Sequence, residues 1–479
     1  MLFNSLDFAV FIPIVFLLYW FVTNKNLKLQ NLLVVVASYI FYGWWDWRFL
    51  SLIVFSTLVD YSVGLQLAKE SNQVKRKLLL WASIGINLGV LGFFKYYNFF
   101  LDNFISAFSF FGMEIQANSL NIILPVGISF YTFQTLSYTI DVYKRKLEPT
   151  KDLISFSAFV SFFPQLVAGP IERAANLLPQ FYKKRQFDYA KAVDGMRQIL
   201  WGLFKKIVVA DNCAQYANEI FNNSADYSGS TLVLGALFFT FQIYGDFSGY
   251  SDIAIGTSRL FGFNLMQNFA FPYFSRDIAE FWRRWHISLS TWFRDYLYIP
   301  LGGSKGGTWL KVKNTFIIFI VSGLWHGANW TFIAWGALNA IYFLPILLTK
   351  RNRRNLDTVA EGRTFPSLKE LSSMLLTFGL TVFAWIFFRA EDMHHALRFI
   401  SDIFSSSLFN IPEIMPENLI QIIVIFVLIE WFGRNSQYAI QNQGSRWKPI
   451  FRYAYYYAIA VTIMYYGNFN ENEFIYFQF

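Results

Sequence analysis

Histidine is the side chain best suited to acid–base chemistry near neutral pH, and the sequence contains four: His286, His326, His394 and His395. His326 lies in VSGLWHGANWTF, between two apolar stretches. An isolated imidazole there is either a general base or a histidine that bridges two helices by hydrogen bonds, and the spacing favours neither interpretation. The flanking Gly323 and Gly327 predict the close approach of another group, either a helix or a substrate.

His286 lies in the segment FWRRWHISLSTWFRDY, where three arginines surround it: Arg283, Arg284 and Arg294. As a helix, the segment would have its apolar residues and the histidine on one side at i, i+3, i+4 and i+7: Trp282, Trp285, His286 and Leu289. One interpretation is an amphipathic helix lying at an interface with an aromatic belt. The other is that the arginines hold phosphate or carboxylate oxygens by forked hydrogen bonds.

Two polar motifs are weaker candidates. IPLGGSKGG, which contains Gly302 and Gly303, is glycine-rich and basic and would form a phosphate cradle or a cytoplasmic turn. We expect the turn, because the segment is not a Walker motif. Asp246 and Asp252 in GDFSGYSD would bind a cation or hold a basic partner, and we expect a structural ion pair with a nearby arginine.

His394 and His395 are expected in a loop or an interfacial helix, in RAEDMHHALRF. No metal site is predicted there, since only Glu391 and Asp392 lie near the pair. Cys213 is the single cysteine, which excludes an intramolecular disulfide and a multi-cysteine metal site. We expect it to be a buried residue without a chemical role.

The composition decides the class of protein. Of 479 residues, 55% are hydrophobic and 15% charged, against roughly 25% charged in soluble domains. Apolar runs recur along the chain at the length of ~20 residues that a membrane span needs. These runs are continuous rather than alternating, which favours helices over a barrel. The sequence therefore predicts an all-α integral membrane protein with ten to thirteen spans, at 6–22, 31–45, 49–67, 78–97, 121–140, 153–170, 195–213, 230–250, 314–330, 331–349, 369–388, 418–434 and 450–466.

Clusters of basic residues separate these spans and indicate their orientation: Lys25, Lys28, Lys69, Lys75, Arg76, Lys77, Lys144, Arg145, Lys146, Lys151, Lys350, Arg351, Arg353 and Arg354. Short loops rich in Lys and Arg stay cytoplasmic. The alternate loops, 43–49 and 98–119, carry few basic residues. Both termini are therefore predicted outside, and the first span is expected to be retained rather than cleaved as a signal peptide. The net charge of +9 comes from basic residues in the loops, where it determines the membrane topology. No nucleic-acid partner is therefore expected.

Residues 241–313 are too polar for ordinary spans and too apolar for a soluble domain. Ionisable residues at membrane depth usually face a cavity, so we expect re-entrant or surface-lying helices around a cavity here, together with the functional site. Thirteen residues separate His326 from Lys313, which marks the expected cytoplasmic edge. At a helical rise of 1.5 Å per residue, this imidazole would lie ~20 Å into the membrane.

The two central motifs carry a family resemblance. RWHISLSTWFRDYLYIPLGG at 284–303, followed by SGLWHGANWTFIAWG at 322–336, resembles the membrane-bound O-acyltransferase (MBOAT) family and, within it, the AlgI-like polysaccharide O-acetylase branch of bacteria. The supporting stretches are ILPVGISFYTFQTLSYTIDVY at 123–143, SFFPQLVAGPIER at 161–173, QIYGDFSGYSDIAIG at 242–256 and EFIYFQF at 473–479. The resemblance runs almost end to end, and composition or spacing alone would not indicate acyl transfer.

The resemblance implies a fold and a location. The whole chain, 1–479, would be one MBOAT domain of about 10–13 transmembrane and re-entrant helices. These would form a ring around a central tunnel, with the catalytic core in 240–336. The protein would be a multi-pass protein of the cytoplasmic (inner) membrane. An acyl donor would enter the tunnel from the cytoplasm and the acceptor from the other face.

The resemblance also implies roles for residues. The family's catalytic histidine matches His326, and its second recurrent histidine matches His286. His326 would take the proton from an attacking hydroxyl, and His286 would orient the donor thioester or bind the oxyanion. The candidates for donor or substrate binding are Arg283, Arg284, Trp285, Trp325, Asn329, Asp246, Gly302 and Gly303. No bound cofactor is expected, and the donor would be acetyl-CoA or another acyl thioester.

The acceptor would be an extracytoplasmic polysaccharide, either an exopolysaccharide such as alginate or peptidoglycan, reached directly or through a periplasmic SGNH-type acetyltransferase. An alternative within the family is D-alanyl transfer toward teichoic acid from an acylated carrier protein, as in DltB-like proteins. An alternative of another class is a transporter or flippase without chemistry. It would handle its substrate equally well in a His326→Ala variant.

Overall fold

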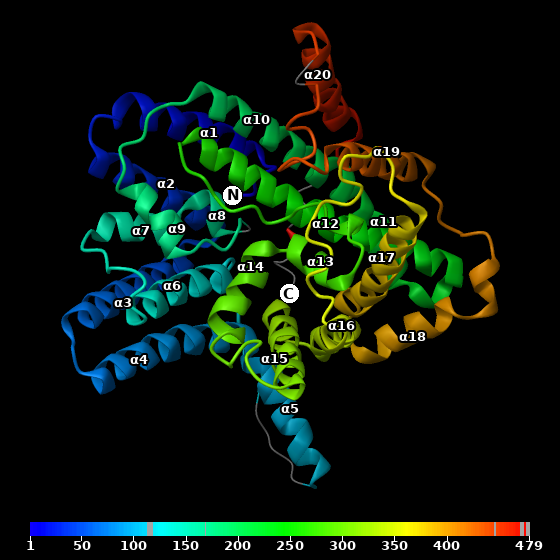
Figure 1. Ribbon diagram of the computed structural model, residues 1–479, viewed down its shortest axis with the longest axis horizontal. Helices are drawn as coiled ribbons and strands as arrows, with labels where there is room; N and C mark the ends of the chain where they lie inside the picture. Colours follow the sequence, from blue (N-terminus) through cyan, green and yellow to red (C-terminus); the bar gives the residue numbers. More distant parts are fainter. Residues whose placement is uncertain (113–117, 168, 445–446, 470–473, 476–479) are drawn as a thin grey trace. The chain divides into compact units, whose positions relative to one another are not determined.

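The computed structural model describes residues 1–112, 118–167, 169–444, 447–469 and 474–475. Every regular element in these ranges is a helix, which confirms the predicted all-α class (Figure 1). The chain divides into two compact units, the first formed by 1–188 and 260–265 and the second by 189–259 and 266–479. The proposed ring and tunnel concern how the helices of both units are arranged, and they stay predictions.

The described residues of the first unit form twelve helical elements, most of them apolar: α1 Leu6–Leu17, η1 Leu18–Val22, α2 Leu27–Asp46, η2 Trp47–Phe49, α3 Leu50–Lys69, α4 Gln73–Leu91, η3 Gly92–Tyr96, α5 Tyr97–Phe110, α6 Ile128–Tyr143, α7 Leu153–Ser161, α8 Phe163–Leu166 and α9 Ala174–Phe181. Side-chain caps begin several of these helices. The oxygen of Asn26 accepts from the first amides of α2, and that of Asn72 does the same for α4.

A buried carboxylate joins three helices of this unit. Asp60 on α3 accepts hydrogen bonds from Ser83 (2.5 Å) and Asn87 (2.9 Å) on α4, and from Thr139 (2.9 Å) on α6. Burying a polar group is tolerated where its hydrogen bonds are made. This network therefore holds α3, α4 and α6 in one register.

The second unit carries both central histidines and comprises the remaining elements: α10 Tyr189–Leu203, η4 Phe204–Ala210, α11 Asp211–Asn222, η5 Ser224–Asp226, α12 Gly229–Leu260 except for its last residue, η6 Pro272–Phe274, α13 Ile278–Arg284, α14 Ile287–Phe293, η7 Arg294–Tyr298, α15 Thr308–His326, α16 Trp330–Leu348, α17 Leu368–Arg389, α18 Met393–Ile403, η8 Ser406–Phe409, α19 Glu417–Gly433 and α20 Pro449–Tyr466. α15 packs along α16, and α16 along α17.

Among the described residues, five helical stretches are long and apolar enough to cross a membrane: Leu27–Lys69, Gln73–Phe110, Gly229–Leu260, Trp330–Leu348 and Leu368–Arg389. The first two have 43 and 38 residues and exceed the ~20 residues of one span. The other expected spans are mostly helical too, but their helices are shorter or less apolar than these five stretches. The expected span 121–140 is helical only from Ile128 onward, and α5 was not expected.

Candidate active site

His326 is the last residue of α15, and the hairpin to α16 places it deep inside the second unit. The two helices approach each other closely at Gly323 and Gly336. A Cβ atom at Gly323 would lie 2.1 Å from the carbonyl oxygen of Phe332, and one at Gly336 would lie 2.3 Å from that of Phe319. The close approach expected at Gly323 is therefore made by a helix.

Aromatic rings surround the imidazole of His326, which is 3% exposed. Its ring centroid lies 4.8 Å from Trp325, 5.1 Å from Trp335 on α16 and 5.2 Å from Phe388 on α17. Rings from three helices thus fix the position of the histidine and exclude bulk water from it.

The helix predicted through His286 is wrong. α13 ends at Arg284, α14 begins at Ile287, and His286 between them has a left-handed backbone with φ of 42°. The amide of Ile287 donates to the carbonyl of Asn268 instead of continuing the helix. Of the four residues expected on one face, Trp282 therefore lies on α13 and Leu289 on α14, while Trp285 and His286 lie in the break between the two helices.

The break turns the His286 side chain into the interior, where it is 1% exposed. Its ring centroid lies 4.6 Å from Phe247 on α12, 5.8 Å from Trp325 and 6.5 Å from His326. Neither ring nitrogen of His286 has a hydrogen-bond partner among the described residues. Two imidazoles more than thirty residues apart in the sequence are thus neighbours in a largely apolar site.

Trp285 and Trp325, two predicted site residues, belong to this surrounding. Trp285 lies 5.1 Å from Trp385 on α17, which stacks on Trp335 at 5.7 Å and 19°. We call this set the aromatic cluster, consisting of Phe247, Trp285, Trp325, Trp335, Trp385 and Phe388 around the two histidines. Phe247, Trp335, Trp385 and Phe388 were not predicted, because their ring contacts join helices far apart in the sequence.

Arg283 and Arg284 lie on α13, and their guanidinium groups bond within the protein. Arg283 donates to the carbonyls of Asn352 (2.7 Å) and Asn355 (2.6 Å), in the loop that follows α16. Arg284 bonds to Glu280 at 3.1 Å and to the carbonyl of Asp357 at 2.9 Å. The two arginines thus fasten this loop to α13, and their contact with a donor stays a prediction.

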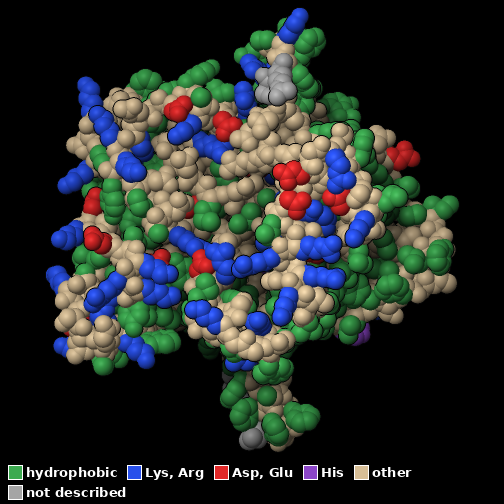
Figure 2. All heavy atoms as spheres, in the orientation of Figure 1, with side chains coloured by type: hydrophobic (Ala, Val, Ile, Leu, Met, Phe, Trp, Pro, Cys, Tyr) green, Lys and Arg blue, Asp and Glu red, His purple; other side chains and the backbone are tan. Residues whose placement is uncertain are grey.

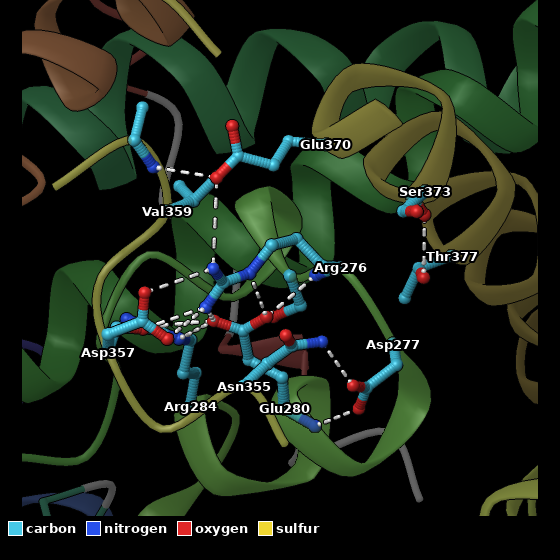
Figure 3. A network of polar contacts seen from close by, with 12 residues as sticks. Arg276, Asp277, Glu280, Arg284, Asn355, Asp357, Val359, Glu370, Ser373 and Thr377 are labelled. Carbon is cyan, nitrogen blue, oxygen red and sulfur yellow. Dashed lines mark hydrogen bonds and ion pairs between the residues drawn. The ribbon is translucent and has the colours of Figure 1, made fainter. Parts of the chain in front are cut away.

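Arg276 completes this fastening and was not identified from the sequence. Its guanidinium pairs with Glu280 at 3.0 Å and Asp357 at 3.1 Å (Figure 3). The hydrogen bonds from Arg276 lower the pKa of the Asp357 carboxyl, which lies outside the apolar spans. Figure 2 shows Lys and Arg side chains gathered on the face drawn. The loop itself carries exposed basic residues: Lys350, Arg351, Arg353 and Arg354.

Asp246 and Asp252 form ion pairs, as expected, but with lysines rather than with an arginine. Nζ of Lys206 lies 2.8 Å from Asp246, and Nζ of Lys205 lies 2.5 Å from Asp252. Both lysines lie in η4, a π-helical turn, and Lys206 also reaches Asp211 at 2.7 Å. The structure therefore gives Asp246 a structural partner, and its place in substrate binding stays a prediction.

Two further candidates have local structural contacts. Gly302 and Gly303 adopt left-handed φ values of 101° and 57°, in a turn held by the side-chain amide of Asn314. Asn329 caps α16 by accepting from the amide of Thr331, and it donates to a main-chain carbonyl at 2.6 Å. Their roles toward a donor or substrate stay predictions.

The remaining expectations concern residues outside the aromatic cluster. His394 and His395 lie on the amphipathic helix α18, so of the loop and the helix expected there the structure shows the helix, and His394 is exposed. Cys213 is fully buried, as expected.

An apolar cavity of about 220 Å³ opens between α12, α17 and α19, with Tyr244 and Tyr273 in its wall. These two rings lie 6.1 and 5.9 Å from Trp285. Neither His286 nor His326 is among its lining residues.

The geometry is a pair of buried histidines, one in the break between α13 and α14 and one at the end of α15, within an aromatic cluster of a polytopic helical protein. The model of the membrane-bound O-acyltransferase family matches residues 150–387, a range that includes both histidines. The chain belongs to this family, and it is an O-acyltransferase enzyme embedded in a membrane.

Individual relatives place the chain more narrowly. It is 39% identical to the probable alginate O-acetylase AlgI of Pseudomonas putida, over 94% of this chain and 91% of that protein. It is 37% identical to the peptidoglycan O-acetyltransferase of Helicobacter pylori, over 83% and 79%. The teichoic acid D-alanyltransferase of Bacillus subtilis is 27% identical over 57% of this chain and 71% of its own length. The similarity thus extends over nearly the whole chain for polysaccharide acetylases and over a smaller part for D-alanyl transfer.

Proposed function

We propose that the enzyme moves an acetyl group from a cytoplasmic thioester to hydroxyl groups of an extracytoplasmic polysaccharide, and that His326 is the general base. The observation that carries the proposal is the pair of buried imidazoles, 6.5 Å apart, within the aromatic cluster. The near full-length similarity to alginate and peptidoglycan acetylases supports the acetyl group and the class of acceptor.

The reaction follows from these groups. The ring of His326 takes the proton of an acceptor hydroxyl while its oxygen attacks the thioester carbonyl carbon. The C–S bond then breaks, the sulfur leaves as a thiol after receiving the proton, and the acetyl group stays on the acceptor oxygen. The neutral ring of His286, with a nitrogen available to donate, stabilises the oxyanion that forms. The aromatic rings exclude water, which would otherwise hydrolyse the thioester.

The test is acetyl transfer by the purified protein reconstituted in lipid vesicles. Acetyl-CoA would be the donor, with alginate and peptidoglycan fragments as acceptors. The variant His326→Ala should lose about 10²- to 10⁴-fold in rate, the usual contribution of a general base. His394→Ala is the matched control, because His394 is exposed on α18. Equal rates in the two variants would exclude His326 as the base.

The donor and the route to the glycan are part of the proposal and need their own comparison. Acetyl-CoA and an acetylated carrier protein should be offered at equal concentration, with and without an SGNH-type periplasmic acetyltransferase. A D-alanylated carrier tests the D-alanyl alternative, which the shorter match to the teichoic acid enzyme raises. Transfer from the D-alanylated carrier alone would replace the acetyl proposal. Because the similar proteins carry the names of enzymes, their similarity favours chemistry over the transport alternative.

A further inference from the structure

His286 has a backbone conformation that a residue with a side chain rarely adopts, and the structure around it explains how this is maintained. Its φ and ψ are 42° and 55°, in the left-handed region. Strained conformations of this kind persist only when surrounding contacts fix them, and they concentrate at functional sites. The contacts that fix His286 come from the segment 268–270, which precedes η6.

Asn268 makes most of these contacts and is fully buried. Its main-chain carbonyl accepts from the amide of Ile287 at 2.9 Å. Its side-chain oxygen accepts from Ser288, at 2.9 Å from the hydroxyl and 3.3 Å from the amide. Its side-chain nitrogen donates to the hydroxyl of Ser251 on α12 at 3.1 Å. One asparagine therefore ties the chain just after His286 to α12.

The chain just before His286 is held by the same segment. The amide of Ala270 donates to the carbonyl of Arg284 at 2.9 Å, and the guanidinium of Arg284 donates to the carbonyl of Ala270 at 3.2 Å. The break between α13 and α14 is thus fixed on both sides, so His286 cannot rotate freely about its backbone.

The helix to which Asn268 is tied also packs on the imidazole. Ser251 and Phe247 are four residues apart on α12 and therefore lie on the same face, one turn from each other. Ser251 binds Asn268, while the ring of Phe247 lies 4.6 Å from that of His286. Contacts with one face of α12 consequently hold both the backbone and the ring of His286.

We propose that Asn268 is a positioning residue for acyl transfer, which acts through His286 by holding its imidazole beside His326. This inference rests on the proposed function for its effect on the reaction. An amide is suited to the role because it accepts from Ser288 and donates to Ser251 at once. Aspartate offers only acceptors when ionised, and alanine offers neither.

The test is a double-mutant cycle of Asn268→Ala and His286→Ala, measured as acetyl transfer in vesicles. Asn268→Ala should lower kcat at least tenfold and leave the KM for the donor within about twofold. In the His286→Ala background it should cause no further loss, because groups that act as a unit are not additive. Losses that multiply in the double variant would overturn the proposal.

Two further variants separate positioning from folding. Ser251→Ala removes only the tie to α12 and should lower kcat in the same direction by a smaller factor, again without effect in the His286→Ala background. Asn31→Ala is the matched control. Asn31 is also a buried asparagine with bonds to two elements, Ser155 and the carbonyl of Phe181, but in the first unit. The Asn31→Ala variant should leave kcat unchanged. The rate is calculated per folded molecule, and size-exclusion chromatography measures the folded fraction.

A readout that needs no activity keeps this inference distinct from the proposed function. Diethyl pyrocarbonate modifies accessible imidazole nitrogens, and mass spectrometry locates the product. His286 should react slowly in the unmodified protein, and at least fivefold faster in Asn268→Ala, with His326 unchanged. If His286→Ala retains full activity, the proposed role of His286 fails, while the labelling still decides whether Asn268 holds it. Equal labelling of His286 in both proteins would refute the proposal that Asn268 holds His286 in position.

Discussion

The aromatic cluster around His286 can be compared with a charged cluster, which consists of Asp246 and Asp252 on α12 with Lys205 and Lys206 in η4. Both clusters are buried in the second unit, but they differ in whether their polar atoms have partners. In the charged cluster, lysine ammonium groups lie 2.5 Å from Asp252 and 2.8 Å from Asp246. In the aromatic cluster, the two ring nitrogens of His286 have no hydrogen-bond partner in the described part of the chain. The clusters adjoin on α12, where Asp246 belongs to one and Phe247 to the other.

This difference indicates that the charged cluster contributes to stability and that the histidines contribute to the reaction. A buried charge is tolerated when it is paired, and removing one partner leaves an uncompensated charge. A buried polar atom without a partner needs another explanation, and a catalytic role is one of them. We therefore expect substitutions in the charged cluster to change the free energy of unfolding, and substitutions around the histidines to change the rate of acyl transfer.

The largest expected effect on stability comes from Lys205→Met. Its side chain is 4% exposed and that of Asp252 11%, so the variant leaves a buried carboxylate without its cation. Removing one partner of such a pair costs about 3–5 kcal/mol. Thermal unfolding in detergent, followed by tryptophan fluorescence, should show a much lower Tm and a reduced yield of folded protein.

The paired replacement Lys205→Met with Asp252→Leu is the control for this prediction. Apolar residues of similar size often replace a buried ion pair at little cost, so the double variant should regain most of the Tm. A single variant that unfolds normally but fails to transfer acetyl groups would place chemistry in the charged cluster and contradict the comparison.

The sequence predicts the helices better than it predicts their partners. Continuous apolar runs were enough to place α2, α3, α16 and α17 within a few residues, because burial in lipid requires them. The expected span 230–250 covers most of GDFSGYSD, but the continuation of α12 from there to Leu260 was missed, since polar residues argue against a span. The lysines that pair with Asp246 and Asp252 lie some forty residues earlier in the sequence. No local sequence pattern predicts such a pairing.

The site shows the same limit. An imidazole isolated between apolar segments made His326 a candidate without deciding between a general base and a structural histidine, and the flanking Gly323 correctly indicated a close approach. The helical periodicity around His286 was misleading, because hydrogen bonds from Asn268 and Ala270 override local preference there. Asn268 itself carried no signal, since a single asparagine in an apolar stretch has many ordinary roles.

A second prediction tests the aromatic cluster without touching a titratable group. In Gly323→Ala, the new methyl group would meet the carbonyl of Phe332 at 2.1 Å, which forces α15 and α16 apart. Overpacking of this kind costs about 1–3 kcal/mol, and it displaces His326 at the end of α15. We expect kcat to fall at least tenfold in the vesicle assay, with a modest drop in Tm.

Gly379→Ala is the matched control, because a Cβ there meets nothing within 4 Å. It lies on α17 and is exposed, so alanine should raise stability slightly, by up to about 1 kcal/mol. Its kcat should equal that of the unmodified enzyme. An equal fall in kcat for both variants would mean that glycine content, rather than the contact between α15 and α16, determines the activity.

The smallest effect is expected where a paired carboxylate lies at the surface. Glu413, in the loop before α19, accepts from the Ser228 hydroxyl at 2.7 Å and from the Thr231 hydroxyl, at the start of α12. These hydrogen bonds lower the pKa of Glu413 from 4.5 to about 2. Because the folded pKa is below the unfolded one, the stabilisation is present above pH 4.5 and is lost as the pH falls toward 2.

Glu413→Gln should therefore flatten the fall of Tm between pH 4.5 and about 2, and should change Tm at pH 7 far less than Lys205→Met does. The exposed position explains the small size, since solvent screens the charge. The measurement is a set of Tm values at several pH values for both proteins, with acetyl transfer at pH 7 unchanged. Identical slopes would show that these hydroxyl contacts do not stabilise the folded carboxylate, and pairing would then matter only in the interior.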